Sequence, residues 1–130
     1  MSYVSRRDSV TRWALRLGKF VLNWACHRLV KAATYEILPG AGFGPDPVSG
    51  RIPCVYLEDG ECRFEVTVAP VLQLWVLRYD PPPEGSRMSA ARHVGDSVAS
   101  ISPSPVKLAQ AIVAVLGSNH FRVRTNDTAI

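Results

Sequence analysis

The stretch PCVYLEDGECRFEVTV, residues 53–68, decides the fold because apolar and polar side chains alternate on both sides of Asp59-Gly60. A period of two is typical of half-buried strands, and Asp-Gly between two such runs is a strong signal for a β-hairpin. We therefore predict an antiparallel hairpin with one apolar face packed on a core. That buried face is expected to consist of Val55, Leu57, Cys62, Phe64 and Val66.

The register of this hairpin depends on its turn. With the Asp-Gly pair as a two-residue turn, Leu57 faces Cys62 and the apolar residues of both strands share one face. The same turn sets Glu58 opposite Glu61, and like charges in that position destabilise a hairpin. A four-residue loop with the same register is therefore the alternative.

Upstream of the hairpin, apolar residues recur at steps of three and four from residue 9 to about residue 33, and basic residues do the same on another side. This pattern predicts a long amphipathic helix with Trp13 and Trp24 facing the core. A short strand is expected near residues 34–38. The four glycines and four prolines of residues 38–53 predict an irregular loop.

Downstream of the hairpin, residues 72–79 carry apolar side chains on both faces, as a strand covered on both sides does. We place this strand at the centre of the sheet. Residues 88–101 space their apolar residues as a weaker helix does.

The last helix has clear boundaries, with Ser104 as N-cap, Pro105 at the first helical position and Gly117 just past the end. Its residues 111–116 are apolar all round and are expected to be largely buried. Residues 120–124 then alternate basic and apolar side chains, which indicates a short final strand with one basic face.

This order of elements predicts the α+β class: a mostly antiparallel sheet of about three to five strands, a long amphipathic N-terminal helix and one or two C-terminal helices. The length of 130 residues and the hydrophobic fraction of 47% suit one core, so residues 1–130 are expected to form a single globular domain. Residues 1–8 are a candidate flexible end, and residues 39–53 and 80–87 are expected loops.

The composition also bears on the compartment. No apolar run approaches the ~18 residues of a membrane span, and the N-terminal stretch lacks the pattern of a secretory signal. The three cysteines, Cys26, Cys54 and Cys62, are an odd number, and the predicted register puts Cys54 and Cys62 on opposite faces of the sheet. We therefore expect a small soluble protein in a reducing, intracellular and cytoplasmic setting, without structural disulfides.

The positive charge is concentrated near the N-terminus. The net charge is +4, and residues 1–35 carry seven basic side chains, Arg28 and Lys31 among them, against Asp8 alone. A basic helix face of this kind can neutralise phosphates, although a solvated surface is its commoner meaning. The candidate binding residues are Arg6, Arg7, Arg12, Arg16 and Lys19, with Arg122 and Arg124 from the final strand. The same Arg-rich segment is also typical of a mitochondrial targeting sequence, which would place the protein there.

Sequence signals for catalysis are weak. The glycines of residues 40–44 are followed by prolines instead of the helix that a phosphate-binding loop needs. Ser104 and Lys107 match the S-x-x-K pattern of serine acyl-transfer enzymes, but a helix cap explains the serine. The cysteines and histidines lack the paired spacings of zinc sites, so we expect no metal and no cofactor.

Three function hypotheses follow. The first is a non-enzymatic binding module whose basic N-terminal helix engages an anionic partner, either a nucleic-acid backbone, bound nonspecifically, or an acidic protein surface. The second is an accessory structural subunit of a larger assembly, viral or organellar complexes included, in which Trp13, Trp24 and Trp75 help to make a protein interface. The third is an enzyme with a cysteine and a histidine brought together by folding. None of the three fixes an oligomeric state.

Overall fold

The computed structural model describes residues 24–69, 73–98 and 104–124. Two helices, a five-stranded antiparallel sheet and a two-stranded sheet make up this part of the chain, so the predicted α+β class is confirmed. The N-terminal helix is described over residues 24–35, and the rest of the helix predicted from residue 9 lies outside the described residues. The other elements are β1 (Ile37–Leu38), β2 (Gly42–Pro45), β3 (Pro53–Asp59), β4 (Cys62–Val68), β5 (Gln73–Tyr79), β6 (Ala91–Val98), α2 (Pro105–Leu116) and β7 (Arg122–Val123).

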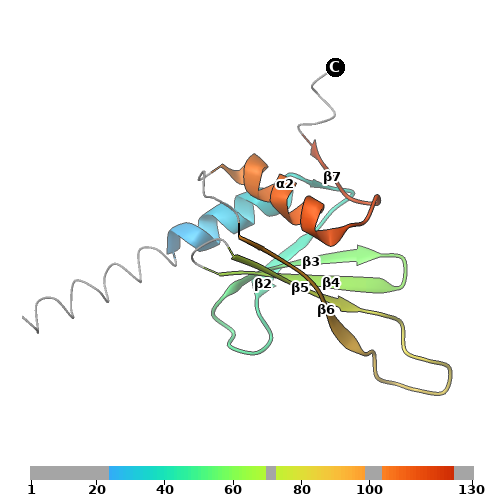
Figure 1. Cartoon of the computed structure of the whole chain (residues 1–130). Helices are drawn as coiled ribbons and strands as arrows, with labels where there is room; N and C mark the ends of the chain where they lie inside the picture. Colours follow the sequence, from blue (N-terminus) through green and yellow to red (C-terminus); the bar gives the residue numbers. More distant parts are fainter. Residues whose placement is uncertain (1–23, 70–72, 99–103, 125–130) are drawn as a thin grey trace, which may run out of the picture.

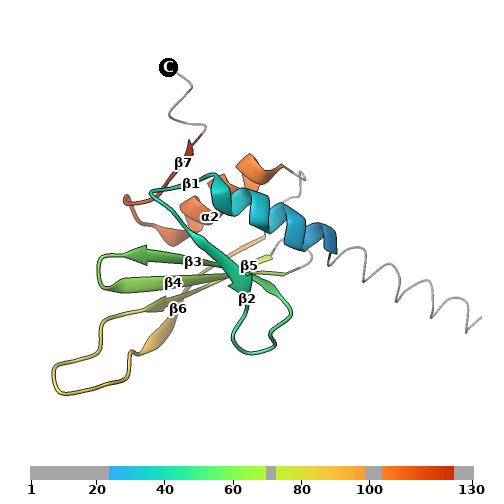
Figure 2. The ribbon, with the colours of Figure 1, turned by 180° about the vertical axis from the view of Figure 1, so that it is seen from behind.

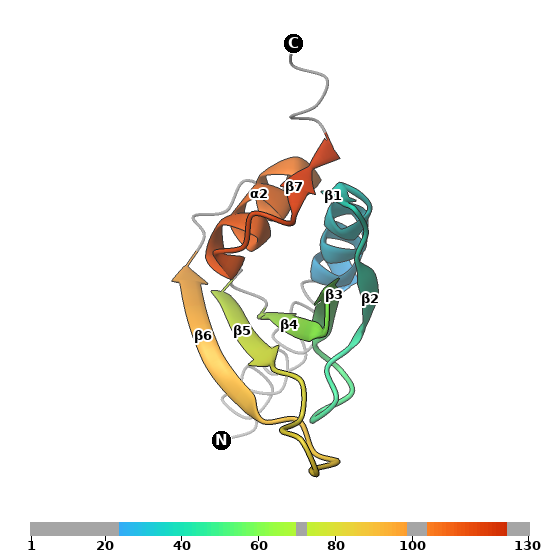
Figure 3. The same cartoon turned by 90° about the vertical axis from the view of Figure 1, so that its right-hand side faces the viewer.

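The two helices lie on one face of the large sheet, whose strand order is β2-β3-β4-β5-β6 (Figure 1). Seen from behind, the N-terminal helix and α2 run side by side over the sheet, and β1 and β7 meet beyond them (Figure 2). The sheet curves around the helices (Figure 3). The sheet therefore has an inner face, which packs against the helices, and an outer face that the described parts of the two helices leave uncovered.

The hairpin is present, and most of its predicted buried face is confirmed. Val55, Leu57, Phe64 and Val66 are all buried in the core. Cys62 lies on the same face but is half-exposed, because it is the first residue of β4, beside the turn.

The predicted register of the hairpin is wrong by two residues. Leu57 pairs with Phe64 instead of Cys62, and the turn residues are Gly60 and Glu61. This register sets Glu58 opposite Arg63 and so removes the like-charge pair of the predicted turn. A shift of two residues leaves every side chain on its face, which is why the buried set was still predicted correctly.

The core fills the space between the inner face and the two helices. It joins side chains of β3, β4 and β5 to one stripe of the N-terminal helix and one stripe of α2. The helical contributions are Cys26, Val30 and Ala33 from the first helix and Leu108, Ala109, Ile112 and Leu116 from α2.

The boundaries of α2 are confirmed. The Ser104 hydroxyl accepts a hydrogen bond from the Lys107 N–H at 3.4 Å, and Pro105 begins the helix. Gly117 ends it with φ of 67°, a left-handed conformation that side chains with a Cβ disfavour. The expectation that residues 111–116 are largely buried is only partly right, because Ile112 and Leu116 are buried but Ala114 is exposed.

The helix predicted over residues 88–101 is wrong. Residues 91–98 form the edge strand β6, and residues 99–101 lie outside the described part. Val94 is an extra residue in the pairing with β5, since His93 pairs with Leu77 and Gly95 pairs with Val76. This bulge interrupts the period of two, so the apolar residues of β6 fall at spacings that resemble a helix.

Two other expectations about the sheet are corrected. Residues 42–45, predicted as irregular loop, form the edge strand β2, which tolerates glycine and proline because one side of an edge strand needs no ladder bonds. The strand over residues 73–79 is next to the edge, and β4 occupies the centre. The outer face of β5 carries Trp75, which is 45% exposed and is covered by neither helix.

The strands of the small sheet lie near their predicted places. β1 covers only the end of the segment expected at residues 34–38, because the first helix continues to residue 35. The predicted final strand is confirmed as β7, with Phe121 and Val123 buried and Arg122 and Arg124 exposed.

Candidate binding surface

The exposed side of the N-terminal helix presents two cations between two aromatic rings. Trp24, Arg28, Lys31 and Tyr35 are all exposed and follow one another at steps of four, three and four residues. Side chains at these spacings lie on one side of a helix. We call these four residues the exposed stripe. The buried residues Cys26, Val30 and Ala33 occupy positions two residues later, which places them about 200° around the helix.

Trp24 contradicts the expectation that it faces the core, because 56% of it is exposed. The Arg28 guanidinium carbon lies 4.9 Å from the centroid of the Trp24 ring, a cation–π contact. Within the described residues, neither Arg28 nor Lys31 forms an ion pair with a carboxylate. The stripe is therefore both cationic and aromatic.

Of the seven predicted binding residues, the structure describes two. Arg122 and Arg124 are exposed in and beside β7, whereas Arg6, Arg7, Arg12, Arg16 and Lys19 lie outside the described residues. The Arg124 Nε donates to the Tyr35 carbonyl oxygen at 3.3 Å, and the Arg124 N–H donates to the Glu36 carbonyl at 2.7 Å. Arg124 therefore lies at the carboxyl end of the exposed stripe, where a cation is favourable to the helix dipole.

A contact from His27 holds the loop between β2 and β3 against the N-terminal helix. His27 Nε2 lies 2.8 Å from the Arg51 carbonyl oxygen. Asp46 organises the loop, since its carboxylate accepts from the Ser49 hydroxyl, at 2.5 Å, and from the Ser49 and Ile52 N–H groups. The bonds from Ser49 above all lower the pKa of Asp46 well below its usual range. The carboxylate is therefore a structural anion.

The outer face of the sheet carries a second group of aromatic side chains. Trp75 and His93 stack with ring centroids 3.9 Å apart, and His93 Nε2 lies 2.6 Å from an Asp96 carboxylate oxygen. Further along the face, the Tyr79 hydroxyl donates to Glu65, which is only 6% exposed, at 3.1 Å. Burial, more than the nearby carboxylate, raises the pKa of Tyr79.

Cys54 is also on the outer face, yet it is fully buried. Tyr56 donates its hydroxyl proton to the Pro45 carbonyl, and its ring lies over Gly44, where a Cβ would be 3.4 Å from that ring. Burial raises the pKa of Cys54 to about 11 and that of Tyr56 to about 12. Cys54 is therefore an unreactive, protonated thiol near neutral pH.

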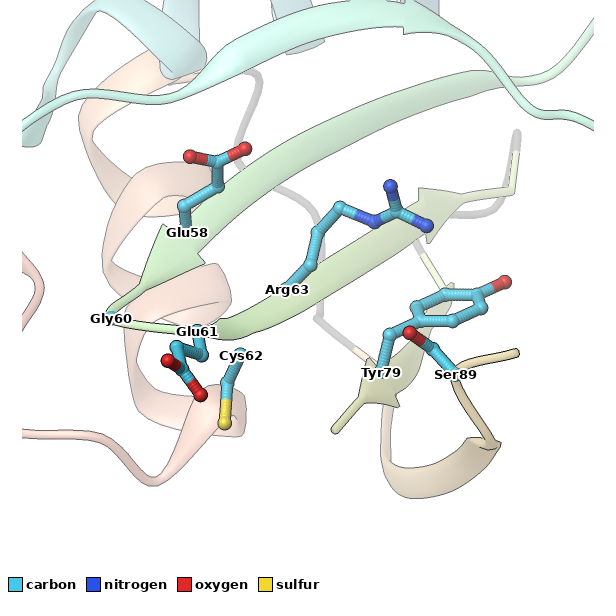
Figure 4. Close-up of a pocket in the computed structure, with 7 residues that line it drawn as sticks. All are labelled: Glu58, Gly60, Glu61, Cys62, Arg63, Tyr79 and Ser89. Carbon is cyan, nitrogen blue, oxygen red and sulfur yellow. The ribbon is translucent and has the colours of Figure 1, made fainter. Parts of the chain in front are cut away.

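A shallow hollow of about 240 Å³ lies at the turn end of the hairpin (Figure 4). Beside it, Arg78 Nη2 donates to Cys62 Sγ at 3.2 Å, and Arg78 Nε pairs with Asp80 at 2.8 Å. The hollow is open and its lining is mostly polar. The lining residues are Glu58, Gly60, Glu61, Cys62, Arg63, Tyr79 and Ser89.

A serine, a histidine and an aspartate meet beside this turn, but not in the order of a catalytic triad. The Ser118 hydroxyl donates to Asp59 at 2.9 Å, and His120 Nδ1 lies 3.9 Å from the other Asp59 oxygen. In a triad the histidine stands between the two and accepts the serine proton. Here the aspartate stands in the middle, so the cluster ties the hairpin to the segment after α2.

The hypothesis of a cysteine and histidine pair gains no geometric support. All three histidines have partners elsewhere, in the Arg51 carbonyl, Asp96 and Asp59. Among the residues that the structure describes, no group of histidine, cysteine and carboxylate side chains could hold a metal ion. In the same part of the chain, no helix has the length and apolar character to cross a bilayer.

No protein-family model, curated protein or solved structure matches this chain. Its function is therefore inferred from the chemistry of its surfaces.

Proposed function

We propose that this chain is a non-enzymatic binding module that engages an anionic partner through the exposed side of its N-terminal helix. The observation that carries the proposal is the exposed stripe, in which Arg28 and Lys31 stand between two exposed aromatic rings without a carboxylate partner in the described residues. Cations placed in this way neutralise phosphates and release counterions from a nucleic acid. The predicted residues Arg6, Arg7, Arg12, Arg16 and Lys19 add to the same charge in the sequence.

Among anionic partners, the aromatic rings favour single-stranded nucleic acid. Trp24 is 56% exposed and Tyr35 is 66% exposed, so both rings are accessible to a partner. Proteins that bind single strands without sequence preference combine cations along the backbone with aromatic rings on which bases stack. The cations by themselves would suit an acidic protein surface equally well. The stripe contains none of the side-chain amides that commonly read base edges, so we expect little sequence preference.

The test is binding of a fluorescently labelled mixed-sequence oligonucleotide, single-stranded and as a duplex, at low salt. We expect the single strand to bind more tightly, and Arg28→Glu with Lys31→Glu to weaken binding by at least about tenfold. Trp24→Ala should reduce the preference for the single strand, because a stacking contact is lost.

The matched control is Arg87→Glu with Lys107→Glu, which makes the same charge change at two exposed positions away from the stripe. This control should keep most of the affinity. Equal losses in the two double variants would mean that only the net charge matters, and would overturn the stripe as the binding site. Absence of binding at low salt would leave an acidic protein surface as the partner, to be tested with the same variants and a polyglutamate probe.

A second candidate, the accessory structural subunit, is supported by Trp75. This ring is 45% exposed on the outer sheet face, and tryptophan is enriched at the centres of protein interfaces. If the chain purifies from its source at fixed stoichiometry with other polypeptides, Trp75→Ala should release them while Trp24→Ala should not. Release by neither substitution would count against this candidate.

A further inference from the structure

The two edges of the large sheet differ in how well they are protected against pairing with another strand. β2 is four residues long and holds two glycines and Pro45, which make it a poor template. β6 is eight residues long, contains neither proline nor lysine, and pairs with β5 alone among the strands of the described residues. Its open side presents backbone groups over about twice the length of β2.

The bulge at Val94 limits what can pair with that edge. Trp75 pairs with Asp96 and Leu77 pairs with His93, so His93 and Asp96 share the outer face although they are three residues apart. The 2.6 Å contact between their side chains agrees with this placement. In a regular strand successive side chains point to opposite faces of the sheet. The inner and outer faces of such a strand can therefore coincide with those of β6 only before the bulge or only after it. A strand with the same extra residue at the same level matches both sides.

We propose that the open edge of β6 pairs antiparallel with β6 of a second copy of this chain, about a two-fold axis between Val94 and Gly95. In this arrangement His93 faces Asp96 of the second copy on the outer face, and the reciprocal pair is made by symmetry. Both bulges then lie at the same level. Each Asp96 carboxylate then faces an imidazole across the axis, without any other change to the surface.

The helix above the edge is compatible with this pairing. Gly95 lies directly beneath α2, since a Cβ there would come within 3.0 Å of Val115 Cγ2 and 3.2 Å of its carbonyl oxygen. The helix therefore extends over the edge strand, and two copies joined at β6 bring their α2 helices together on the inner face. The exposed Ala114 and half-exposed Ala111 are small enough to allow a close approach. Eight paired residues with a small helix contact form a modest interface, so the dimer depends on concentration.

The test is the mass of the full chain in solution, by sedimentation equilibrium over a range of concentrations. We expect a shift from 14.3 kDa toward twice that value as the concentration rises. Asp96→Arg, which replaces the carboxylate that faces His93 of the second copy with a guanidinium, should raise the dissociation constant by at least about tenfold. Glu58→Arg makes the same charge change on the same face three strands away and should leave the mass unaffected.

A mixing experiment separates pairing from misfolding. His93→Asp sets carboxylates against each other across the axis, and Asp96→Arg removes the carboxylate that faces His93, so each variant alone should remain mostly monomeric. In a one-to-one mixture the arginine introduced at position 96 of one variant faces the aspartate introduced at position 93 of the other, and the dimer mass should return. A wild-type chain that stays at 14.3 kDa at every concentration, or a mixture that stays monomeric while the wild type dimerises, would overturn the proposal.

Discussion

The two helices pack on the same face of the sheet, yet they present very different surfaces to solvent. The exposed positions of α2 are Lys107, Gln110 and Ala114, one cation and two neutral side chains. The N-terminal helix exposes two cations and two large aromatic rings over a similar length. Both helices bury the apolar stripe that folding requires. Folding therefore explains the buried side of each helix, whereas we attribute the aromatic and cationic side of the first helix to the proposed binding.

This difference has a consequence for mutations. Changes on the buried side of either helix should lower the free energy of unfolding, and changes on the exposed stripe should lower affinity while leaving stability nearly unchanged.

Ile112→Ala should destabilise the protein most. Ile112 lies on α2 and is fully buried in the core. Truncating its side chain leaves a cavity that lowers the free energy of unfolding by about 2–5 kcal/mol. Chemical denaturation followed by far-UV circular dichroism measures the change. Gln110→Ala on the exposed side of the same helix and Lys31→Ala on the first helix are the controls, each expected within about 0.5 kcal/mol of the wild type. A large loss for Lys31→Ala would show that the exposed stripe is structural.

Gly117→Ala should cost about 1 kcal/mol, because φ of 67° at the end of α2 is unfavourable for a residue with a Cβ. The space around Gly117 is open, so the cost is conformational and not steric. Gly42→Ala is a matched control at an ordinary φ, where the new Cβ would meet the Tyr56 Cβ at a normal 3.6 Å. Equal losses at both glycines would contradict the assigned helix end. Thermal unfolding of the two variants makes the comparison.

Asp46 should make the loop next to the N-terminal helix sensitive to acid. Its pKa is lowered in the folded state, so its stabilisation is present above the unfolded pKa of ~3.9 and is lost as pH falls toward the folded value. Amide hydrogen exchange at Ser49 and Ile52 should therefore gain protection from the carboxylate at neutral pH and lose it in acid. In Asp46→Ala the same amides should lack this protection at both pH values. Protection that is equal in the variant and the wild type at neutral pH would contradict the role of Asp46.

The parts of the fold that sequence predicts well are those with a local chemical cause. Ser104, Pro105 and Gly117 mark the ends of α2 because each fits one position of a helix terminus. The buried face of the hairpin follows from a period of two that survives a register error of two residues. In both cases the cause lies entirely in neighbouring residues.

The parts that sequence predicts wrongly depend on distant contacts. The bulge at Val94 gives the apolar residues of β6 a helix-like spacing, and the bulge can be recognised only from the pairing with β5. β2 consists of residues that favour loops, and it forms because β3 offers a partner along its whole length. Helical periodicity shows which residues share a side of the helix, but it does not show which side packs against the sheet. Trp24 was therefore assigned to the core although its side of the helix faces solvent.

The candidate site was predicted only in part. Arg28 and Lys31 belong to the basic N-terminal segment but were not among the seven predicted binding residues, whereas the predicted residues Arg122 and Arg124 are exposed. The aromatic half of the surface was missed because Trp24 was assigned to the core. A cue was present in the spacing, since Trp24 lies four residues before Arg28 and not in phase with Cys26 and Val30.

The salt dependence of binding tests the central claim most directly. The measurement is the affinity for a mixed-sequence single strand over a salt series, for the wild type and for Arg28→Ala with Lys31→Ala. If both cations neutralise phosphates, the slope of log K against log salt should become shallower by about 1.4, since each contact to a single strand contributes about 0.7. A double variant that binds with the wild-type affinity and the wild-type slope would contradict the account.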